Sequence, residues 1–190
     1  MVCLREIDFR PPPNMRILVT GGAGFIGANF LNLLVPRHPE HQFVNLDALT
    51  YAANLGSLDA VANRSNYTFE RVDLCDFSAL RAVFAQHKPD VVVHFAAESH
   101  VDRSITGPRA FVRTNVEGTF NLLEACRELW APGQGLLHHV STDEVFGSLA
   151  KPACSTKKPA TIRRAPIPRP RRPAITWCTP GTAPSACRCG

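Results

Sequence analysis

The chain has 190 residues and a net charge of +5, but the charge is unevenly distributed. Nine Lys or Arg and no Asp or Glu follow Glu144, so residues 1–144 carry a net charge of −4. The basic part offers no fold or aromatic platform to present its charge, so we expect no nucleic-acid partner. No apolar run could span a bilayer, and the seven cysteines form no CxxC pair, so we expect a cytoplasmic protein with reduced thiols and no membrane or metal partner.

Three segments are expected along the chain. Residues 1–14 contain a triple proline and no strand pattern, so they are expected to be a disordered extension before an alternative start at Met15. Residues 15–150 are expected to form one nucleotide-binding domain. Residues 151–190 hold half of the 16 prolines and are expected to be a disordered tail.

A glycine-rich turn follows the first expected strand, Arg16 to Thr20. It reads Gly22-x-Gly24-x-x-Gly27, preceded by Gly21, and leads into a helical pattern. Such glycines allow a tight turn, close approach of the backbone to a pyrophosphate, and tight packing of helix on strand. The apolar stripe of the helix is expected to consist of Phe25 or Ile26, Phe30, Leu33 and Leu34, and to stop at Pro36.

An acidic residue ends the second expected strand, in "HQFVNLDALT". Asp47 lies twenty residues after Gly27, where a carboxylate hydrogen-bonds the adenosine ribose hydroxyls and repels a 2′-phosphate. The sequence therefore favours NAD over NADP as the cofactor.

The alternation of strand and helix continues to the end of the ordered pattern. Strands are expected in "YTFERVDLCD", "DVVVHFAAES" and "GLLHHVSTDE". Helices are expected over 77–90, with Phe77, Leu80 and Phe84 on one face, and over about 108–130, with Val116, Phe120 and Leu123 spaced i, i+4, i+7. Short connections between such elements predict an α/β fold, a doubly wound parallel sheet of the Rossmann type, incomplete in this chain.

Five stretches carry a family resemblance: "ILVTGGAGFIG", "NLDALTYAANL", "HFAAESHVDRSI", "RTNVEGT" and "HHVSTDEVFGSL". Together they resemble the nucleoside-diphosphate-sugar branch of the extended short-chain dehydrogenases, and within it the dTDP-glucose 4,6-dehydratases. The resemblance covers Met15 to about Leu149. It implies an NAD-dependent lyase that acts on dTDP-glucose in deoxysugar biosynthesis, with a family-type homodimer possible in an intact protein.

The implied reaction is oxidation at C4 of the sugar, loss of water across C5 and C6, and re-reduction at C6. Oxidation at C4 acidifies the C5 proton, so elimination needs a base, and the departing C6 hydroxyl needs an acid. The family's motif places the acid at Asp143 and the base at Glu144, with Thr142 hydrogen-bonding the C4 oxygen. Taken alone, this Asp-Glu pair would read as an ordinary helix cap with a first-turn acid.

The resemblance also implies the cofactor contacts. They begin in the glycine turn, continue along the ribose (Asp47 to Thr50) and the adenine, and end on the nicotinamide side (Phe95 to Ser99), where Ser99 also touches the sugar nucleotide. The implied residues are Gly21, Gly24, Phe25, Ile26, Gly27, Asp47, Thr50, Asp73, Leu74, Phe95, Ala96, Ala97, Ser99 and Thr114.

The chain departs from the family at the Tyr-x-x-x-Lys pair that takes the C4 hydroxyl proton. Its two tyrosines, Tyr51 and Tyr67, have no Lys four residues later. We therefore expect this chain to be inactive. Two alternatives remain open: an NAD-binding Rossmann module without catalysis, or a sibling dehydratase or epimerase of another nucleotide sugar.

The residues after about Leu149 are expected to be a frameshifted reading of the same gene. One permitted spelling of "APIPRPRRPAITWC", read two bases later, encodes Pro-Tyr-Ser-Ala-Ser-Lys-Ala-Ala-Ser-Asp-His-Leu-Val, which contains the missing motif. A GC-rich gene read out of frame would also explain the loss of acids and the excess of Pro and Arg.

Overall fold

The computed structural model describes residues 14–131, 134–142 and 145. The expected extension, apart from Asn14, and the expected tail at 151–190 lie outside these residues, so both remain predictions. Within the described part of the chain, no helix is long and apolar enough to cross a membrane.

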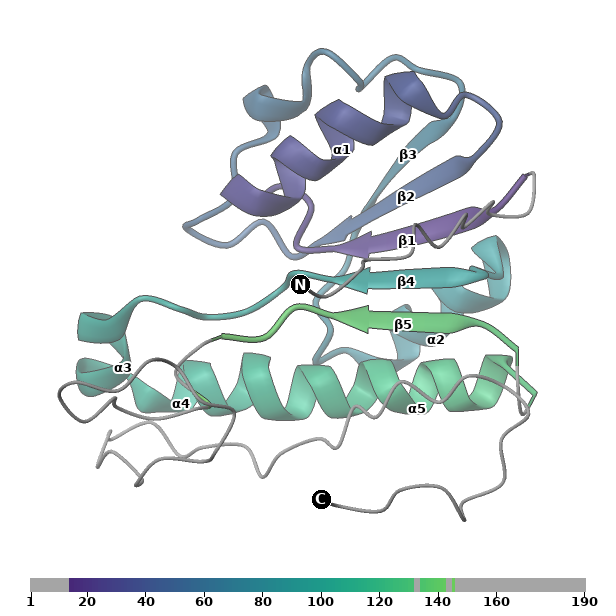
Figure 1. Ribbon diagram of the computed structural model, residues 1–190. Helices are drawn as coiled ribbons and strands as arrows, with labels where there is room; N and C mark the ends of the chain where they lie inside the picture. Colours follow the sequence, from purple (N-terminus) through teal and green to yellow (C-terminus); the bar gives the residue numbers. More distant parts are fainter. Residues whose placement is uncertain (1–13, 132–133, 143–144, 146–190) are drawn as a thin grey trace, which may run out of the picture.

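Five parallel strands form one sheet in the order β3-β2-β1-β4-β5 (Figure 1). They are β1 (Arg16–Thr20), β2 (Gln42–Asp47), β3 (Tyr67–Arg71), β4 (Val91–His94) and β5 (Leu136–His139). The chain builds outward from β1 to β3 on one side and then returns to place β4 against the other side of β1. The predicted doubly wound parallel sheet is confirmed, and the reversal of direction lies between β1 and β4.

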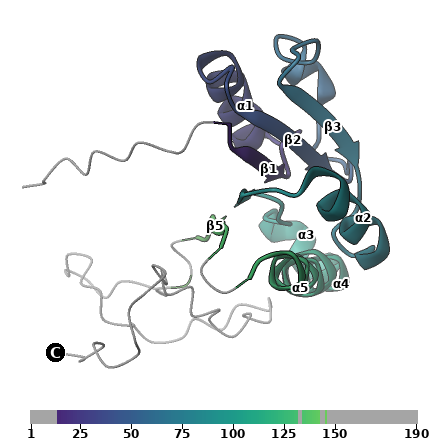
Figure 2. The same ribbon diagram turned by 90° about the vertical axis from the view of Figure 1, so that its right-hand side faces the viewer.

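Helices cover both faces of the sheet. Helix α1 (Phe25–Arg37) lies on one face, together with the 3-10 turn η1 (Leu55–Leu58), while α2 (Phe77–His87) and α5 (Thr119–Leu129) lie on the other (Figures 1 and 2). Two short helices, α3 (Val101–Thr106) and α4 (Pro108–Val112), follow β4, and a π-helical segment η2 (Arg113–Gly118) joins α4 to α5. In place of the single helix expected over about 108–130, α4, η2 and α5 follow one another without a break, and η2 is π-helical.

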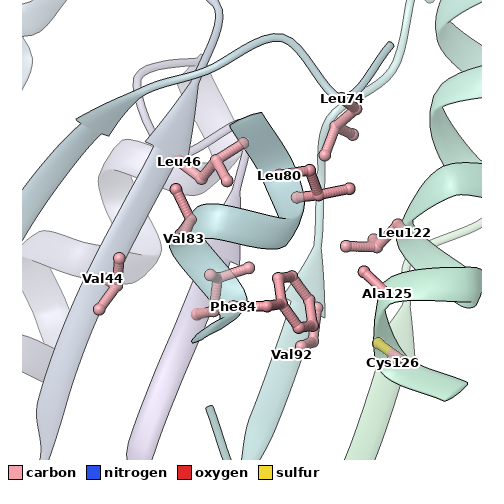
Figure 3. Close-up of a cluster of buried hydrophobic side chains, with 11 residues drawn as sticks. Val44, Leu46, Leu74, Leu80, Val83, Phe84, Val92, Leu122, Ala125 and Cys126 are labelled. Atoms are coloured by element: carbon pink, nitrogen blue, oxygen red, sulfur yellow. The ribbon is translucent and has the colours of Figure 1, made fainter. Parts of the chain in front are cut away.

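The core is divided by the sheet, because neighbouring residues of a strand point to opposite faces. Val92 packs with Leu80, Phe84 and other side chains of α2 and α5 (Figure 3), and Leu18 belongs to the same cluster. On the opposite face, strand residues pack with α1, η1 and the turn after η1. The strand residues include Ile17, Val19, Phe43 and Val93, and their partners include Leu31, Val35, Leu58 and Val61. Strands buried on both faces explain the continuous apolar runs in the sequence.

The apolar stripe expected in α1 was partly right, and the one expected in α5 was wrong. In α1, Phe30 and Leu34 pack against the core as expected, but the fully buried residues are Gly27, Ala28, Leu31 and Val35, and Leu33 is 48% exposed. In α5 the buried residues are Leu122, Ala125 and Cys126, whereas Phe120 is 59% exposed. Small residues face the sheet because helix and strand approach closely, and large apolar residues on the other side mimic a core stripe. Pro36 also lies within the last turn of α1 and does not end it.

Candidate functional site

A pocket opens at the carboxyl ends of β1, β2, β3 and β4, where the strand order reverses. Ligands of open α/β sheets bind at such a place. Most of the cofactor residues implied by the sequence line it together, although they come from five separate stretches. These shared residues are Gly21, Gly24, Asp47, Thr50, Asp73, Leu74, Phe95, Ala96, Ala97 and Thr114.

Two glycines make the turn between β1 and α1 as tight as it is. Gly21 has a φ of +70°, and a Cβ there would lie 2.6 Å from the backbone nitrogen of Ala96. A Cβ on Gly27 would collide with the carbonyl oxygen of Gly21 and lie 2.6 Å from Gly22 Cα. Only residues without side chains bring the turn, the helix and the β4 loop this close.

The first turn of α1 faces this pocket without a side-chain cap. Its N-cap is Gly24, which lines the pocket and has no side chain to accept a hydrogen bond from the helix. The first N–H groups of a helix have no partners within it and carry partial positive charge. The turn therefore offers backbone donors to an anion such as a pyrophosphate.

Asp47 joins two loops of the pocket through its carboxylate. Oδ2 accepts a hydrogen bond from the backbone N–H of Ala23 at 2.9 Å, and Oδ1 accepts one from Leu49 at 2.8 Å. The second bond holds Leu49 at a φ of +56°, a conformation that a leucine rarely adopts. Each carboxylate oxygen has a second lone pair, so Asp47 can also accept hydrogen bonds from ribose hydroxyls.

A second group of contacts builds the wall formed by Asp73, Leu74 and Thr114. Asp73 Oδ1 accepts a hydrogen bond from the backbone of Cys75 at 2.9 Å, and Asp73 Oδ2 lies 3.2 Å from Arg113 Nη2. Asn121 Nδ2 donates to the carbonyl oxygen of Leu74 at 2.9 Å. Segment η2 and helix α5 are thereby tied to the loop after β3.

Beneath the pocket, a buried histidine joins three elements. Thr20 Oγ1 lies 2.6 Å from His94 Nδ1, and His94 Nε2 lies 3.2 Å from Thr119 Oγ1. Thr20 Oγ1 also accepts a hydrogen bond from the backbone N–H of Ala96 at 3.4 Å. The Thr20 hydroxyl can then donate to Nδ1, which leaves the ring proton on Nε2. Burial, and secondarily the neighbouring His139, lowers the pKa of His94 to about 3, so the ring is neutral at pH 7.

Other residues implied by the sequence lie outside the pocket lining. The side chains of Phe25 and Ile26 are 86% and 59% exposed, and neither residue lines the pocket. Ser99 is exposed beyond the Phe95–Glu98 stretch. Thr142 is exposed after β5, and its carbonyl oxygen accepts a hydrogen bond from Val145 at 3.4 Å. Asp143 and Glu144 lie outside the described residues.

Sequence reasoning missed four lining residues: Leu46, Ala52, Ala53 and Val72. Leu46 and Val72 directly precede Asp47 and Asp73, and their signal is simply adjacency to a residue that was named. Ala52 and Ala53 had a weaker signal, because small residues in "TYAANL" leave room beside a ligand. Ala48 and Glu98 also line the pocket, and both lie inside the stretches that the resemblance implied.

A His-Glu-His group lies just after α1. The donor atoms of His38, Glu40 and His41 lie within 4.8 Å of one another. However, His41 Nδ1 accepts a hydrogen bond from the backbone N–H of Met15 at 3.3 Å, which places the ring proton on Nε2. The nitrogen that faces Glu40 therefore lacks the lone pair that a metal ion needs.

A family model described as GDP-mannose 4,6 dehydratase matches residues 18–166. Among curated relatives, a dTDP-glucose 4,6-dehydratase of Shigella flexneri is 51% identical over 144 residues, which is 73% of this chain and 40% of the relative. The chain therefore spans about 40% of the length of that relative.

Solved structures agree on the fold. The dTDP-glucose 4,6-dehydratase DesIV of Streptomyces venezuelae, solved with NAD bound, superposes with a TM-score of 0.71 at 41% identity, over 80% of this chain and 47% of DesIV. A UDP-Glc/GlcNAc 4-epimerase of Campylobacter jejuni superposes nearly as well, with a TM-score of 0.70 at 28% identity, over 81% of this chain and 45% of the epimerase. Backbone shape is thus shared by both kinds of enzyme, while sequence identity is higher to the dehydratase.

Proposed function

The chain belongs to the GDP-mannose 4,6-dehydratase family, and from this membership we propose that its pocket binds NAD. We propose further that the chain is the cofactor-binding part of a dTDP-glucose 4,6-dehydratase. The observation that carries the proposal is the pocket itself: a glycine turn without a Cβ, an uncapped helix start and Asp47 converge at the reversal of the strand order.

The residues present fit a dinucleotide from one end to the other. The α1 turn would hold the pyrophosphate, and Asp47 with Thr50 would hold the adenosine ribose. Asp73 and Leu74 would contact the adenine, and Phe95, Ala96 and Ala97 would border the nicotinamide. The cofactor, when bound, supplies the acceptor for the hydride that leaves C4 of the sugar.

The protein's own residues would then manage protons around the sugar. Thr142 would hydrogen-bond the oxygen at C4, Glu144 would remove the proton at C5, and Asp143 would protonate the departing hydroxyl at C6. Adjacent carboxyls can take opposite roles when their surroundings separate their pKa values. Ser99 would hold the sugar nucleotide.

We propose that this chain alone does not turn over the substrate. Neither Tyr51 nor Tyr67 is followed by Lys at the fourth position, so the proton acceptor for the C4 hydroxyl is missing. Loss of a general base costs typically 10²–10⁴-fold in rate. We therefore propose a chain that binds cofactor but does not complete the reaction.

Two further proposals concern partners and location. Val112, Val116, Phe120 and Leu123 are each 37–59% exposed along α4, η2 and α5, which supports packing of this face against a second copy in an intact homodimer. We also propose a cytoplasmic location, in keeping with the reduced thiols expected from the cysteine pattern.

Calorimetry of the 190-residue protein with NAD⁺ and NADP⁺ tests the binding proposal. We expect NAD⁺ to bind more tightly, and equal affinity for the two would contradict it. Incubation with dTDP-glucose tests the second part. We expect no 4-keto product, and turnover near the rate of a full-length dehydratase would refute the assignment of an incomplete site. NAD⁺ binding together with epimerised rather than dehydrated sugar would favour the epimerase alternative.

A further inference from the structure

Two loops face each other across the mouth of the nucleotide pocket. One follows β2 and contributes Thr50, Ala52 and Ala53 to the lining, and the other follows β4 and contributes Phe95 to Glu98. Tyr51 lies within the first loop, and its hydroxyl donates a hydrogen bond to Glu98 Oε2 at 2.9 Å. This bond joins residues 47 positions apart and runs from one lip of the pocket to the other.

A third residue holds the tyrosine from its ring face. The guanidinium carbon of Arg103, in α3, lies 3.6 Å from the centroid of the Tyr51 ring. A cation over an aromatic face at this distance is attractive. Arg103 therefore supports the Tyr51 side of the bond.

Glu98 is the fixed side of this arrangement. Its backbone N–H donates to Asn115 Oδ1 at 2.8 Å, and Asn115 Nδ2 donates to its carbonyl oxygen at 2.8 Å. Asn115 belongs to η2, the segment that also carries the pocket residue Thr114. The two hydrogen bonds hold the backbone of Glu98 against η2. If the pocket mouth opens, we therefore expect the loop that carries Tyr51 to move.

The position of Tyr51 sets it apart from an ordinary core aromatic residue. It is 52% exposed, yet its hydroxyl and its ring face both have partners. Exposed contacts of this kind contribute little to folding stability. The hydrogen bond to Glu98 raises the pKa of the Tyr51 hydroxyl, so the group stays protonated and remains a donor.

We propose that Tyr51, Glu98 and Arg103 form a clasp across the pocket mouth that slows the release of bound NAD. The clasp rests on the proposal that the pocket binds NAD. A dinucleotide that lies between the two loops can leave only when they separate, and separation breaks the Tyr51–Glu98 bond. The clasp therefore acts on the dissociation rate. Tyr51 and Arg103 are positioning residues, since they act through the loops.

Stopped-flow fluorescence on the full chain tests the clasp. The protein is loaded with NADH and mixed with excess NAD⁺, which gives the dissociation rate, and direct mixing gives the association rate. Loss of one hydrogen bond in Tyr51→Phe should speed dissociation about 3- to 10-fold, with association changed less than about twofold. Tyr51→Ala, which also removes the ring under Arg103, should dissociate faster still.

The matched control is the same change at the other tyrosine. Tyr67 is in β3, outside the pocket lining, and its hydroxyl accepts a hydrogen bond from Asn45 Nδ2 at 2.9 Å. Tyr67→Phe should leave the dissociation rate unchanged. Glu98→Gln alone is ambiguous because Glu98 lines the pocket, so it is combined with Tyr51→Phe: a double variant no faster than the faster single variant supports the pair.

Each remaining outcome counts against a definite statement. Equal dissociation rates for Tyr51→Phe and the wild type overturn the clasp while leaving NAD binding intact. Fully additive effects of Tyr51→Phe and Glu98→Gln overturn it as well. Failure of the folded wild type to bind NADH overturns the proposed function, and the clasp with it.

Discussion

Asp47 Oδ2 accepts a hydrogen bond from the backbone N–H of Ala23 at 2.9 Å, so the residue that ends β2 holds the turn that begins α1. The other oxygen holds Leu49, and the carboxylate is 24 residues from one partner and two from the other. A side chain expected to recognise a ribose is therefore also a structural link between two loops. This double role makes the effect of removing it larger than the loss of one ligand contact.

Replacing Asp47 should therefore weaken NAD⁺ and narrow the preference for it. In Asp47→Ala, loss of charge-assisted hydrogen bonds should lower NAD⁺ affinity about 10- to 100-fold, and NADP⁺ affinity should fall less because the repulsion of its 2′-phosphate is gone. Calorimetry with both cofactors measures the ratio. Asp59→Ala, at an exposed aspartate after η1, is the control and should bind as the wild type does. An unchanged preference in Asp47→Ala would remove Asp47 from cofactor selection.

A methyl group at Gly27 should damage both the turn and its ligand site. The added Cβ would meet backbone atoms of Gly21 and Gly22, which cannot rotate away. We expect Gly27→Ala to lose about 1–3 kcal/mol of unfolding free energy and most of its NAD⁺ affinity. Urea denaturation and calorimetry measure the two effects.

The control for this change is Gly107→Ala, where the nearest atom would be Arg103 O at an ordinary 3.6 Å. It should change NAD⁺ affinity little. If Gly27→Ala binds NAD⁺ like Gly107→Ala, the close approach of turn and helix has no part in binding.

Stability should fall in acid because of His94. Its pKa is lowered to about 3 in the folded protein, from an ordinary 6.5. Between these two pH values, His94 is therefore protonated in the unfolded chain but not in the folded protein. The stabilising contribution is complete above pH 6.5 and is lost as the pH falls toward 3, at about 1.4 kcal/mol per pH unit. Burial also lowers the pKa of His139, which adds to the same trend.

Urea denaturation at pH 7, 6, 5 and 4 measures this slope. We expect His94→Gln to be less stable than the wild type at pH 7. Its unfolding free energy should also fall less steeply as the pH is lowered, with a slope smaller by about 1.4 kcal/mol per pH unit, the effect of one proton. His100→Gln, at an exposed histidine before α3, should keep the slope of the wild type. Parallel curves for His94→Gln and wild type would mean that His94 is not the group responsible.

The DNA that encodes residues after about Leu149 should contain a second, meaningful frame. We propose one base lost, or two gained, between roughly Leu149 and Cys154, and we expect the shifted frame to encode Tyr-Ser-Ala-Ser-Lys opposite Pro166 to Arg171. Resequencing this stretch is the measurement. A full-length gene with the frame restored should then give a product that dehydrates dTDP-glucose, unlike the present chain. If that frame does not encode the motif, the alternative of an NAD-binding Rossmann module without catalysis would be favoured.

The sheet could be predicted from the sequence because strands buried on both faces are uninterrupted apolar runs, as in Val91 to Val93. The sequence was also sufficient for the glycine turn and Asp47 because each occupies a fixed place relative to a strand end. Helix faces were harder. Phe120 is more hydrophobic than Ala125, so an apolar pattern places Phe120 in the core. In the structure the alanine is buried and the phenylalanine is exposed, because α5 packs closely on its neighbours.

Contacts between distant loops could not be read from the sequence at all. Glu98 and Tyr51 meet because β2 and β4 both flank β1, and nothing in either stretch specifies the other. The same holds for Thr20 and His94, which are paired across neighbouring strands 74 residues apart. Such pairs follow from topology, so they emerge only when the strand order is known.

The central place of β1 also has a consequence for synthesis on the ribosome. The chain up to Arg71 supplies β1, β2 and β3, and with them Gly21 and Asp47, before any residue of β4 has been made. The opposite wall, from Phe95 to Thr114, follows about 2–9 s later at ordinary rates of translation, taken as roughly 5–20 residues per second. A nascent chain therefore presents half a nucleotide cradle with nothing facing it. A ligand stabilises a state only as far as that state binds it, so we expect the cofactor to stabilise the chain fully only once both walls of the pocket are present.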